Sequence, residues 1–351
     1  MRSRTKTIIA LSIIPQILVV KLLSRFPTFI ENYYSNGLYL WVSKAMRFVF
    51  GWVPFSVGDV LYTIASIYVI RWFLLNRRRI IKDTKYWLRD ILVAVSLLYF
   101  SFHILWGMNY YRLPLHESLG LDYNYSTEEL AEVTDQLTLI SNTLHAKISA
   151  SDSMKITMPY EKVELLKTSP SGYDQVKATF PQLDPSPISL KRSIYSLPLT
   201  YMGFSGYLNP FTNEAQIDGL IPLHKYPSTS SHELAHQIGY AAENEANFVG
   251  FLAATKHENE YYQYSGYIFG LKYCLVEILR RDPELFEQKK AVINQGILNN
   301  YEEERLFWES YQNPLEPIFK STFNTFLKAN NQDKGIESYS YVVALLVNYL
   351  K

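Results

Sequence analysis

The sequence has only one cysteine, Cys274, in 351 residues. A disulfide framework within the chain and a cysteine-rich zinc knuckle are therefore excluded, and any metal ligands must be His, Asp or Glu. We interpret Cys274 as a small buried apolar side chain. An excess of basic charge is missing too, since 34 Lys and Arg residues face 33 Asp and Glu residues. This balance argues against nucleic acid as a partner.

Aromatic residues and long apolar stretches, in contrast, are abundant. The chain has 28 tyrosines, a residue favoured where one end of the ring is apolar and the other is wet, as at membrane surfaces. Apolar stretches lie at about residues 7–23, 58–75 and 90–108, and each is near the length that crosses about 30 Å of hydrocarbon. A cleaved signal peptide is the alternative for the first stretch, and buried core helices are the alternative for the others. The missing cleavage motif and the apolar residues on all faces favour three transmembrane helices.

The distribution of charge predicts the orientation of these helices. The strongest basic cluster lies between the second and third stretches and consists of Arg77, Arg78, Arg79, Lys82, Lys85 and Arg89. Basic loops stay in the cytoplasm, and a basic N-terminus on the same side is consistent with three spans. We therefore predict a membrane region over residues 1–112 and an extracytoplasmic domain over residues 113–351. The aromatic-rich segment 26–56 is expected at the outer membrane surface.

The predicted domain at residues 113–351 is α+β and mostly helical. Ser126 and Glu129 form a capping box at the start of an amphipathic helix. Between residues 185 and 222, Gly, Asn and Pro separate β-prone residues, which predicts short strands with a hairpin near residues 210–213. We expect these strands to form a small antiparallel sheet. Helices are then predicted over the ranges 231–238, 241–256, 262–281 and 338–350.

The stretch HELAH has the residue types of a metal site with a built-in base. On a helix, His232 and His236 project from the same face and can bind one ion. Glu233 can take a proton from metal-bound water and pass it to a leaving group. Two imidazoles and a carboxylate suit Zn²⁺, with the fourth position left for water. Ser230 fits a capping box with Glu233, and Gly239 can end the helix.

A third ligand is expected on the next helix. The short turn after the motif brings Glu243 back toward the two histidines. Glu245 competes for this role, but on a helix it points about 200° away from Glu243. Asn247, one turn after Glu243, can orient the Glu243 carboxylate by a hydrogen bond. The alternative interpretation of the H-E-x-x-H pattern is a chance spacing of two histidines, followed by an ordinary acidic helix start.

The stretch HELAHQIGYAAENEANFVGFLAA resembles the core of the gluzincin metallopeptidases, in which H-E-x-x-H is followed by E-x-x-x-D or E-x-x-A-N on the next helix. The resemblance implies a zincin-like domain with His232, His236 and Glu243 as zinc ligands and Glu233 as the base. Asn247 in place of Asp and the very short link between the helices depart from the commoner pattern. Most of the chain also resembles a family of uncharacterised bacterial multipass membrane proteins, which implies the bacterial inner membrane.

Other parts of a peptidase site are also expected. Residues 208–217 are a candidate edge strand, to which an extended peptide adds as another strand. A plain surface hairpin is the alternative. A donor that stabilises the oxyanion is needed as well. The sequence offers His224, Tyr264 and Tyr339 for this role and does not choose among them.

We therefore predict a membrane-anchored zinc metallopeptidase, whose peptide or protein substrate the sequence does not name. One alternative is a membrane scaffold or sensor that keeps a zinc site and does not cleave. Against it, a structural zinc site needs no base and usually closes all four positions with protein ligands. The other alternative is a zinc hydrolase of an envelope polymer or a lipid. A strand edge beside the metal favours peptides, whereas a wide open cleft favours polymers.

Overall fold

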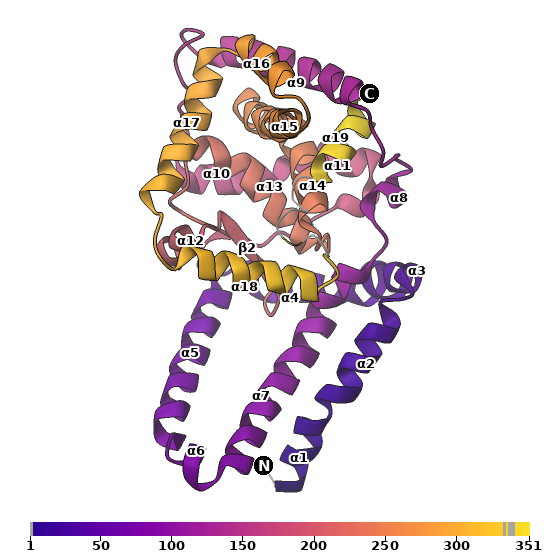
Figure 1. Cartoon of the computed structure of the whole chain (residues 1–351), viewed down its shortest axis with the longest axis vertical. Coiled ribbons are helices and arrows are strands. Elements are labelled where there is room, and N and C mark those ends of the chain that lie inside the picture. Colours follow the sequence, from indigo (N-terminus) through magenta and orange to yellow (C-terminus); the bar gives the residue numbers. More distant parts are fainter. Residues whose placement is uncertain (1–2, 333–334, 336–340) are drawn as a thin grey trace.

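Long apolar helices gather at one end of the molecule, and a mostly helical body forms the other end (Figure 1). The computed structural model describes residues 3–332, 335 and 341–351. Within these residues, three helical stretches are long and apolar enough to cross a membrane. They are α1 and α2 (Ser3–Leu11 and Ile13–Leu23), α5 (Val57–Asn76) and α7 (Thr84–Leu105). The predicted apolar stretches are therefore helices, and their length and composition support membrane association.

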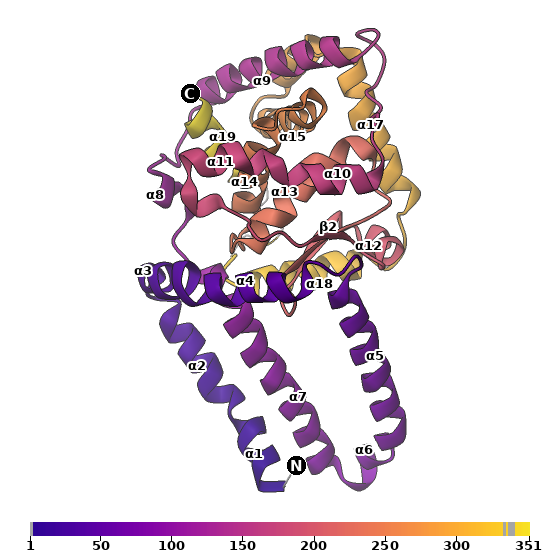
Figure 2. The same ribbon diagram turned by 180° about the vertical axis from the view of Figure 1, so that it is seen from behind.

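Short helices connect the long ones. The end far from the body is closed by α6 (Arg79–Lys82), which lies within the basic cluster (Figures 1 and 2). The connector next to the body consists of α3 (Pro27–Phe29), the π-helix η1 (Ile30–Leu38) and α4 (Tyr39–Phe50). This connector lies across the ends of the long helices (Figure 2). Trp41 and Phe48 on it, and Trp52 just after it, are each 79% exposed. Exposed Trp and Phe rings at this level are typical of a membrane–water interface.

The body is built from helices around a continuous apolar core. Before the sheet these are η2 (Gly107–Tyr111), α8 (Leu115–Leu119), α9 (Thr127–Ile148), α10 (Lys162–Thr168), η3 (Ser169–Ser171), α11 (Gly172–Thr179) and η4 (Pro181–Leu183). After the sheet they are η5 (Leu223–Lys225), α13 (Tyr226–Gln237), α14 (Glu243–Thr255), α15 (Glu260–Arg281), α16 (Pro283–Ala291), α17 (Gln295–Ser310), α18 (Glu316–Ala329) and α19 (Val342–Leu350). The capping box of Ser126 and Glu129 at the start of α9 is confirmed. Residue 338, the predicted start of the last helix, lies outside the described residues.

The sheet is small and mixed. Its described strands are β1 (Leu190–Arg192), β2 (Gly206–Asn209) and β3 (Glu214–Ile217), in the order β1-β3-β2. β2 and β3 form the predicted hairpin and are antiparallel. β1 pairs with the other edge of β3 in parallel, so the prediction of an antiparallel sheet is wrong for this strand. The segment that connects β1 to β3 contains α12 (Ser196–Met202) as well as β2, so it is long enough for the connection that a parallel pair needs.

The helix that carries the motif starts earlier than predicted. Its first residue is Tyr226, with Pro227 in the first turn, a position that proline favours because its missing N–H has no intrahelical partner there. Ser230 is therefore inside the helix and caps nothing. α13 packs tightly on α14, since a Cβ on Gly250 would lie only 2.9 Å from the backbone nitrogen of His232. This close contact holds α13 and α14 side by side.

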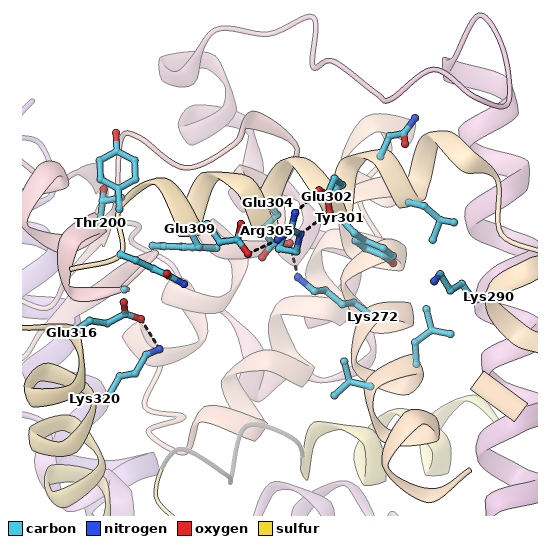
Figure 3. Close-up of a pocket in the computed structure, with 18 of the residues that line it drawn as sticks. Thr200, Lys272, Lys290, Tyr301, Glu302, Glu304, Arg305, Glu309, Glu316 and Lys320 are labelled. Atoms are coloured by element: carbon cyan, nitrogen blue, oxygen red, sulfur yellow. Dashed lines mark hydrogen bonds and ion pairs between the residues drawn. The ribbon is translucent and has the colours of Figure 1, made fainter. Parts of the chain in front are cut away.

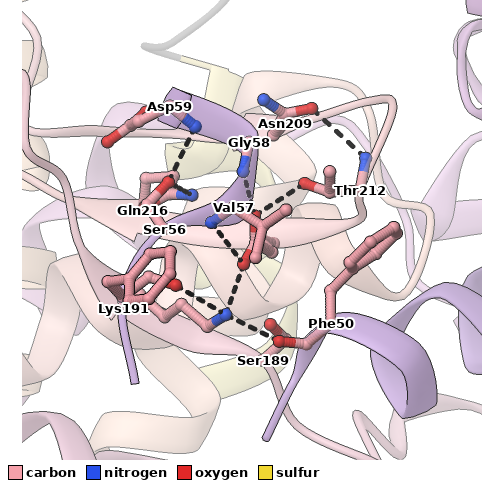
Figure 4. Close-up of polar contacts among 12 residues, drawn as sticks. Phe50, Ser56, Val57, Gly58, Asp59, Ser189, Lys191, Asn209, Thr212 and Gln216 are labelled. Carbon is pink, nitrogen blue, oxygen red and sulfur yellow. Dashed lines mark hydrogen bonds and ion pairs between the residues drawn. The ribbon is translucent and has the colours of Figure 1, made fainter. Parts of the chain in front are cut away.

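A buried ionic cluster fastens α5 to the sheet (Figure 4). The Glu214 carboxylate on β3 accepts hydrogen bonds from the backbone N–H groups of Val57 (3.2 Å) and Gly58 (2.5 Å), at the start of α5. It also accepts one from Thr212 (2.9 Å) and pairs with the Lys191 ammonium on β1. A carboxylate at a helix N-terminus satisfies N–H groups that lack intrahelical partners. The cluster therefore holds the first turn of α5 against the sheet.

The last carbonyl groups of α13 are capped by the N-terminal third of the chain. Carbonyl groups at a helix C-terminus need outside donors, because the helix itself offers none. Here the donors come from the connector and from the segment that follows α7: Trp106 to the His236 carbonyl (3.2 Å), Tyr39 and Arg47 to Gln237 (2.9 and 3.1 Å), and Arg112 to Gly239 (3.0 Å). The end of the motif helix is thus held by the part of the chain that contains the long apolar helices.

Candidate metal centre

His232, His236 and Glu243 lie together in the structure. Each offers one ligand atom, and these atoms all lie within 4.8 Å of one another. The Oε2 atom of Glu243 is 3.4 Å from the Nε2 of His232 and 3.5 Å from the Nε2 of His236. The histidines are one turn apart on α13, and Glu243 begins α14. The short turn between the helices brings the carboxylate to the imidazoles.

A second contact orients the ring of His236. Its Nδ1 atom lies 2.7 Å from the carbonyl oxygen of Tyr240. Because a carbonyl oxygen can only accept a hydrogen bond, Nδ1 carries a proton, and the Nε2 atom faces Glu243. This is the arrangement by which metal-binding histidines are commonly fixed.

Burial and mutual attraction shift the pKa values of the cluster. Burial by itself would raise the pKa of the Glu243 carboxyl, but the two neighbouring imidazoles lower it below its usual range. Burial by itself would lower the pKa of His236, but Glu243 raises it to about 9. The Glu243 carboxylate is therefore ionised and favours a positively charged neighbour.

Glu233 lies beside the cluster without taking part in its ion pairs. Burial raises the pKa of its carboxyl to about 8, with a further rise caused by Glu243 and an opposing effect of His236. Its Oε2 atom is buried and has no hydrogen-bond partner within the described residues. An unpartnered buried carboxylate costs free energy, and such groups occur where chemistry needs them.

The two other polar residues of α14 face different surroundings. Oε1 of Glu245 accepts a hydrogen bond of 2.6 Å from the backbone N–H of Leu115, at the start of α8. The carboxylate of Glu245 therefore points away from the histidines. The Asn247 amide donates to the hydroxyl of Tyr273 over 3.3 Å, and both residues line the same pocket as the histidines.

This pocket has a volume of about 770 Å³ and is bounded on one side by the sheet. β2 is an edge strand, and Gly206, Tyr207 and Leu208 on it line the pocket. A Cβ on Gly206 would lie 2.7 Å from Oε1 of Glu233, so only glycine lets the strand approach this closely. Of the predicted segment 208–217, only its first residues are on this edge, because β3 is the central strand.

The structure places two of the three suggested oxyanion donors away from the pocket. His224 and Tyr264 are buried next to Asn300, and neither lines the pocket. Tyr339 lies outside the described residues. Tyr110 and Tyr273 line the pocket instead. No spacing relative to the motif indicates either of them in the sequence, because long-range packing brings them there.

A second, charged hollow does not contain the cluster (Figure 3). Lys272, Arg305 and Lys320 line it together with Glu304 and other acidic residues. Their charges are paired, for example Lys272 with Glu304 at 2.9 Å and Arg305 with Glu302 at 2.6 Å. Arg305 and Glu302 are about half exposed, and exposed pairs of this kind contribute little to stability.

Fold and site together define a class: a mostly helical chain with helices of membrane-spanning length and a His–His–Glu group of metal-ligand type. The chain belongs to the family described as "Protein of unknown function (DUF3810)", whose model matches residues 34–347. The resemblance to an uncharacterised family over most of the chain is thereby confirmed. No curated protein and no solved structure matches the chain.

Proposed function

We propose that the protein is a membrane-anchored zinc metallopeptidase. The observation that carries this proposal is the group of His232, His236 and Glu243 with the buried, unpartnered carboxylate of Glu233 next to it. A purely structural metal site would need no such base and usually has four protein ligands. Glu233 lines the pocket together with the three ligand-type residues.

The donor atoms fit zinc in type and in spacing. In a tetrahedral site with zinc–ligand bonds of about 2.1 Å, neighbouring ligand atoms lie about 3.4 Å apart. The Glu243 oxygen is 3.4 Å and 3.5 Å from the two imidazole nitrogens. Two imidazoles and one carboxylate also form the ligand set of several catalytic zinc sites, which keep the fourth position open.

The proposed reaction needs a metal ion and a base. Zinc, when bound, polarises the substrate carbonyl and makes water more acidic. Glu233 accepts the proton of the attacking water and then delivers it to the leaving amine, so that the C–N bond is replaced by a carboxylate and an amine. Glu233 lies in the same pocket as the three ligand-type residues, where its carboxylate can serve both roles.

The edge strand favours peptides over polymers or lipids as substrates. The carbonyl of Ser205 accepts a hydrogen bond from the Asp218 N–H over 2.8 Å. Because successive residues of an antiparallel strand alternate between the partner and the open side, the N–H and C=O groups of Gly206 and Leu208 point to the open edge. An extended peptide can pair with these groups beside Glu233.

The proposal is tested by metal content and hydrolysis in variants. Purified protein should hold one Zn²⁺ per chain by atomic absorption. Glu233→Gln should keep the zinc and slow the hydrolysis of a peptide library by at least about 100-fold, because a base is lost and no ligand is. His232→Ala should lose both. Glu245→Gln is the matched control, a buried Glu outside the cluster, and should change neither. Unchanged hydrolysis in Glu233→Gln would show that the assigned base is wrong.

A further inference from the structure

The pocket of the metal centre reaches the ends of the long apolar helices. It is lined by Tyr62 of α5 and by Phe102 and Trp106 at the end of α7, together with His232 and Glu233. The ring of Trp106 also packs edge-on against His236, with centroids 6.1 Å apart. The metal centre and the membrane-type helices therefore share one cavity.

Helix lengths place this cavity at the surface of the bilayer. α7 has 22 residues, which gives about 33 Å at 1.5 Å per residue, slightly more than the hydrocarbon thickness of about 30 Å. Trp106 directly follows α7 and donates its indole N–H to the His236 carbonyl. With α7 across a bilayer, His236 thus lies at the membrane–water boundary.

Part of the cavity lies deeper than this boundary. Tyr62 comes five residues after the start of α5 at Val57, a depth of about 7 Å along the helix axis. Its ring contacts Tyr207 and Phe211, with centroids 6.4 and 6.3 Å away. Phe102 contacts Phe326 of α18 in the same way, at 6.0 Å. The membrane side of the cavity is therefore an aromatic wall.

The cavity has an open approach from within the membrane plane. Residues 64–71 of α5 are all exposed, which is more than two full turns. No face of the middle of α5 is therefore covered by another part of the described chain. The rings of Trp72 and Trp87 stack where α5 and α7 meet near α6, with centroids 6.1 Å apart. Between this contact and the body the two ribbons run separately (Figures 1 and 2), and the exposed residues of α5 there face the bilayer.

We infer that the substrate is a polypeptide with its own membrane-spanning segment, which enters between α5 and α7. Its first extended residues outside the hydrocarbon then pair with the edge of β2 and are cut at the metal centre. The aromatic wall can contact the apolar end of such a chain, and the edge of β2 can form hydrogen bonds with its backbone. A lipid would leave the strand edge unused, and a soluble peptide would leave the wall uncovered. This inference rests on the proposed function for the cleavage step alone.

The test uses the full chain in phosphatidylcholine–phosphatidylglycerol vesicles supplied with zinc. One peptide library has a randomised ten-residue segment fused to a Leu/Ala helix of about 20 residues. A second library has the segment alone, and a third carries a palmitoyl chain in place of the helix. Mass spectrometry should find cuts in the helix-anchored library at a rate at least about 10-fold above both others. Equal rates in the soluble or the palmitoylated library would overturn the inference.

A variant in the pocket tests the same inference in a second way. Tyr62→Ala should slow the cutting of the anchored library by about 5-fold, since an aromatic contact with the substrate is lost, and should leave the zinc content unchanged. Tyr86→Ala, the same change at the far end of α7, is the control.

If no library is cut, the peptidase proposal fails, and binding is then tested separately. For this purpose benzoylphenylalanine replaces the residue at position 62 in the Glu233→Gln variant, and its photo-crosslinks to each library are measured. An adduct with the anchored library alone supports the inference, and an absent adduct, or an equal one from position 86, contradicts it.

Discussion

Glu243 and Glu245 are two residues apart on α14 and serve different parts of the molecule. Glu243 contacts both imidazoles of the motif, whereas Glu245 accepts the Leu115 N–H. At 100° per residue, their side chains point about 200° apart on the helix. The rotation of α14 thus decides which carboxylate can bind a metal.

This difference predicts the metal affinity of three variants. Glu243→Ala should lower the zinc affinity by at least about 10-fold, because a ligand is lost. Asn247→Ala should lower it less, since its side chain contacts His232 and Tyr273 and supplies no ligand atom. Glu245→Ala should leave the affinity nearly unchanged. Competition with a chromophoric chelator measures all three, and zinc loss in Glu245→Ala with retention in Glu243→Ala would contradict the assignment.

The residues that could be predicted from the sequence are those related by helix geometry. The pairing of His232 with His236 follows from the spacing of one turn, and the approach of Glu243 follows from a short turn. Tyr62, Trp106 and Tyr273 could not be predicted. They lie far from the motif in the sequence, and only tertiary packing brings their rings into its pocket.

At the scale of elements, one carboxylate ties three helical segments together. Glu304 on α17 contacts the Lys225 ammonium just before α13 (3.2 Å) and the Lys272 ammonium on α15 (2.9 Å; Figure 3). Burial by itself would raise the pKa of Glu304, but the two lysines lower it to about 2. The ionised form of Glu304 is thus favoured by the folded state.

Glu304→Gln should therefore destabilise the protein in a pH-dependent way. The folded pKa of Glu304 lies below its ordinary value of 4.5, so its contribution is fully present above about pH 4.5 and is lost as the pH falls toward 2. We expect a loss of about 3 kcal/mol at pH 7, because a partner of the buried Lys225 is removed. Denaturant unfolding of both proteins in micelles at pH 7 and pH 3 measures this. A difference that grows at pH 3 would contradict the assignment.

Elements with strong local signals were predictable, and those set by distant contacts were not. The start of α9 is defined by Ser126 and Glu129 within one turn. The start of α13 was misplaced because the serines before His232 look like caps, while Pro227 allows the helix to begin earlier. The parallel pairing of β1 with β3 depends on residues separated by α12, and no local pattern indicates it.

At the scale of the whole molecule, the orientation in the membrane stays a prediction. It rests on the basic cluster around α6, because loops rich in Lys and Arg usually stay in the cytoplasm. A phosphatase that is active only outside the cytoplasm should work when fused after Lys351 and fail when fused near Asp83. The opposite pattern would put the candidate metal centre in the cytoplasm and would change the range of possible substrates.

The predicted division into residues 1–112 and 113–351 is crossed by many polar contacts. Glu214 holds the start of α5, and Arg112 joins Glu31 (2.6 Å) to the Gly239 carbonyl. Composition separates an apolar part from a mixed part of the chain, but it does not show how tightly they are joined. Buried ion pairs and helix caps become visible only in three dimensions.

The capping of α13 by Tyr39, Arg47, Trp106 and Arg112 has a consequence for biosynthesis. All these donors leave the ribosome more than a hundred residues before the end of α13, because the chain is made from its N-terminus. The last turn of the motif helix, with His236 in it, can therefore be capped as soon as it is made, provided that the N-terminal third of the chain is already in place. A copy whose N-terminal third is misplaced lacks these donors, so the candidate metal centre depends on the earlier folding of the part that contains the long apolar helices.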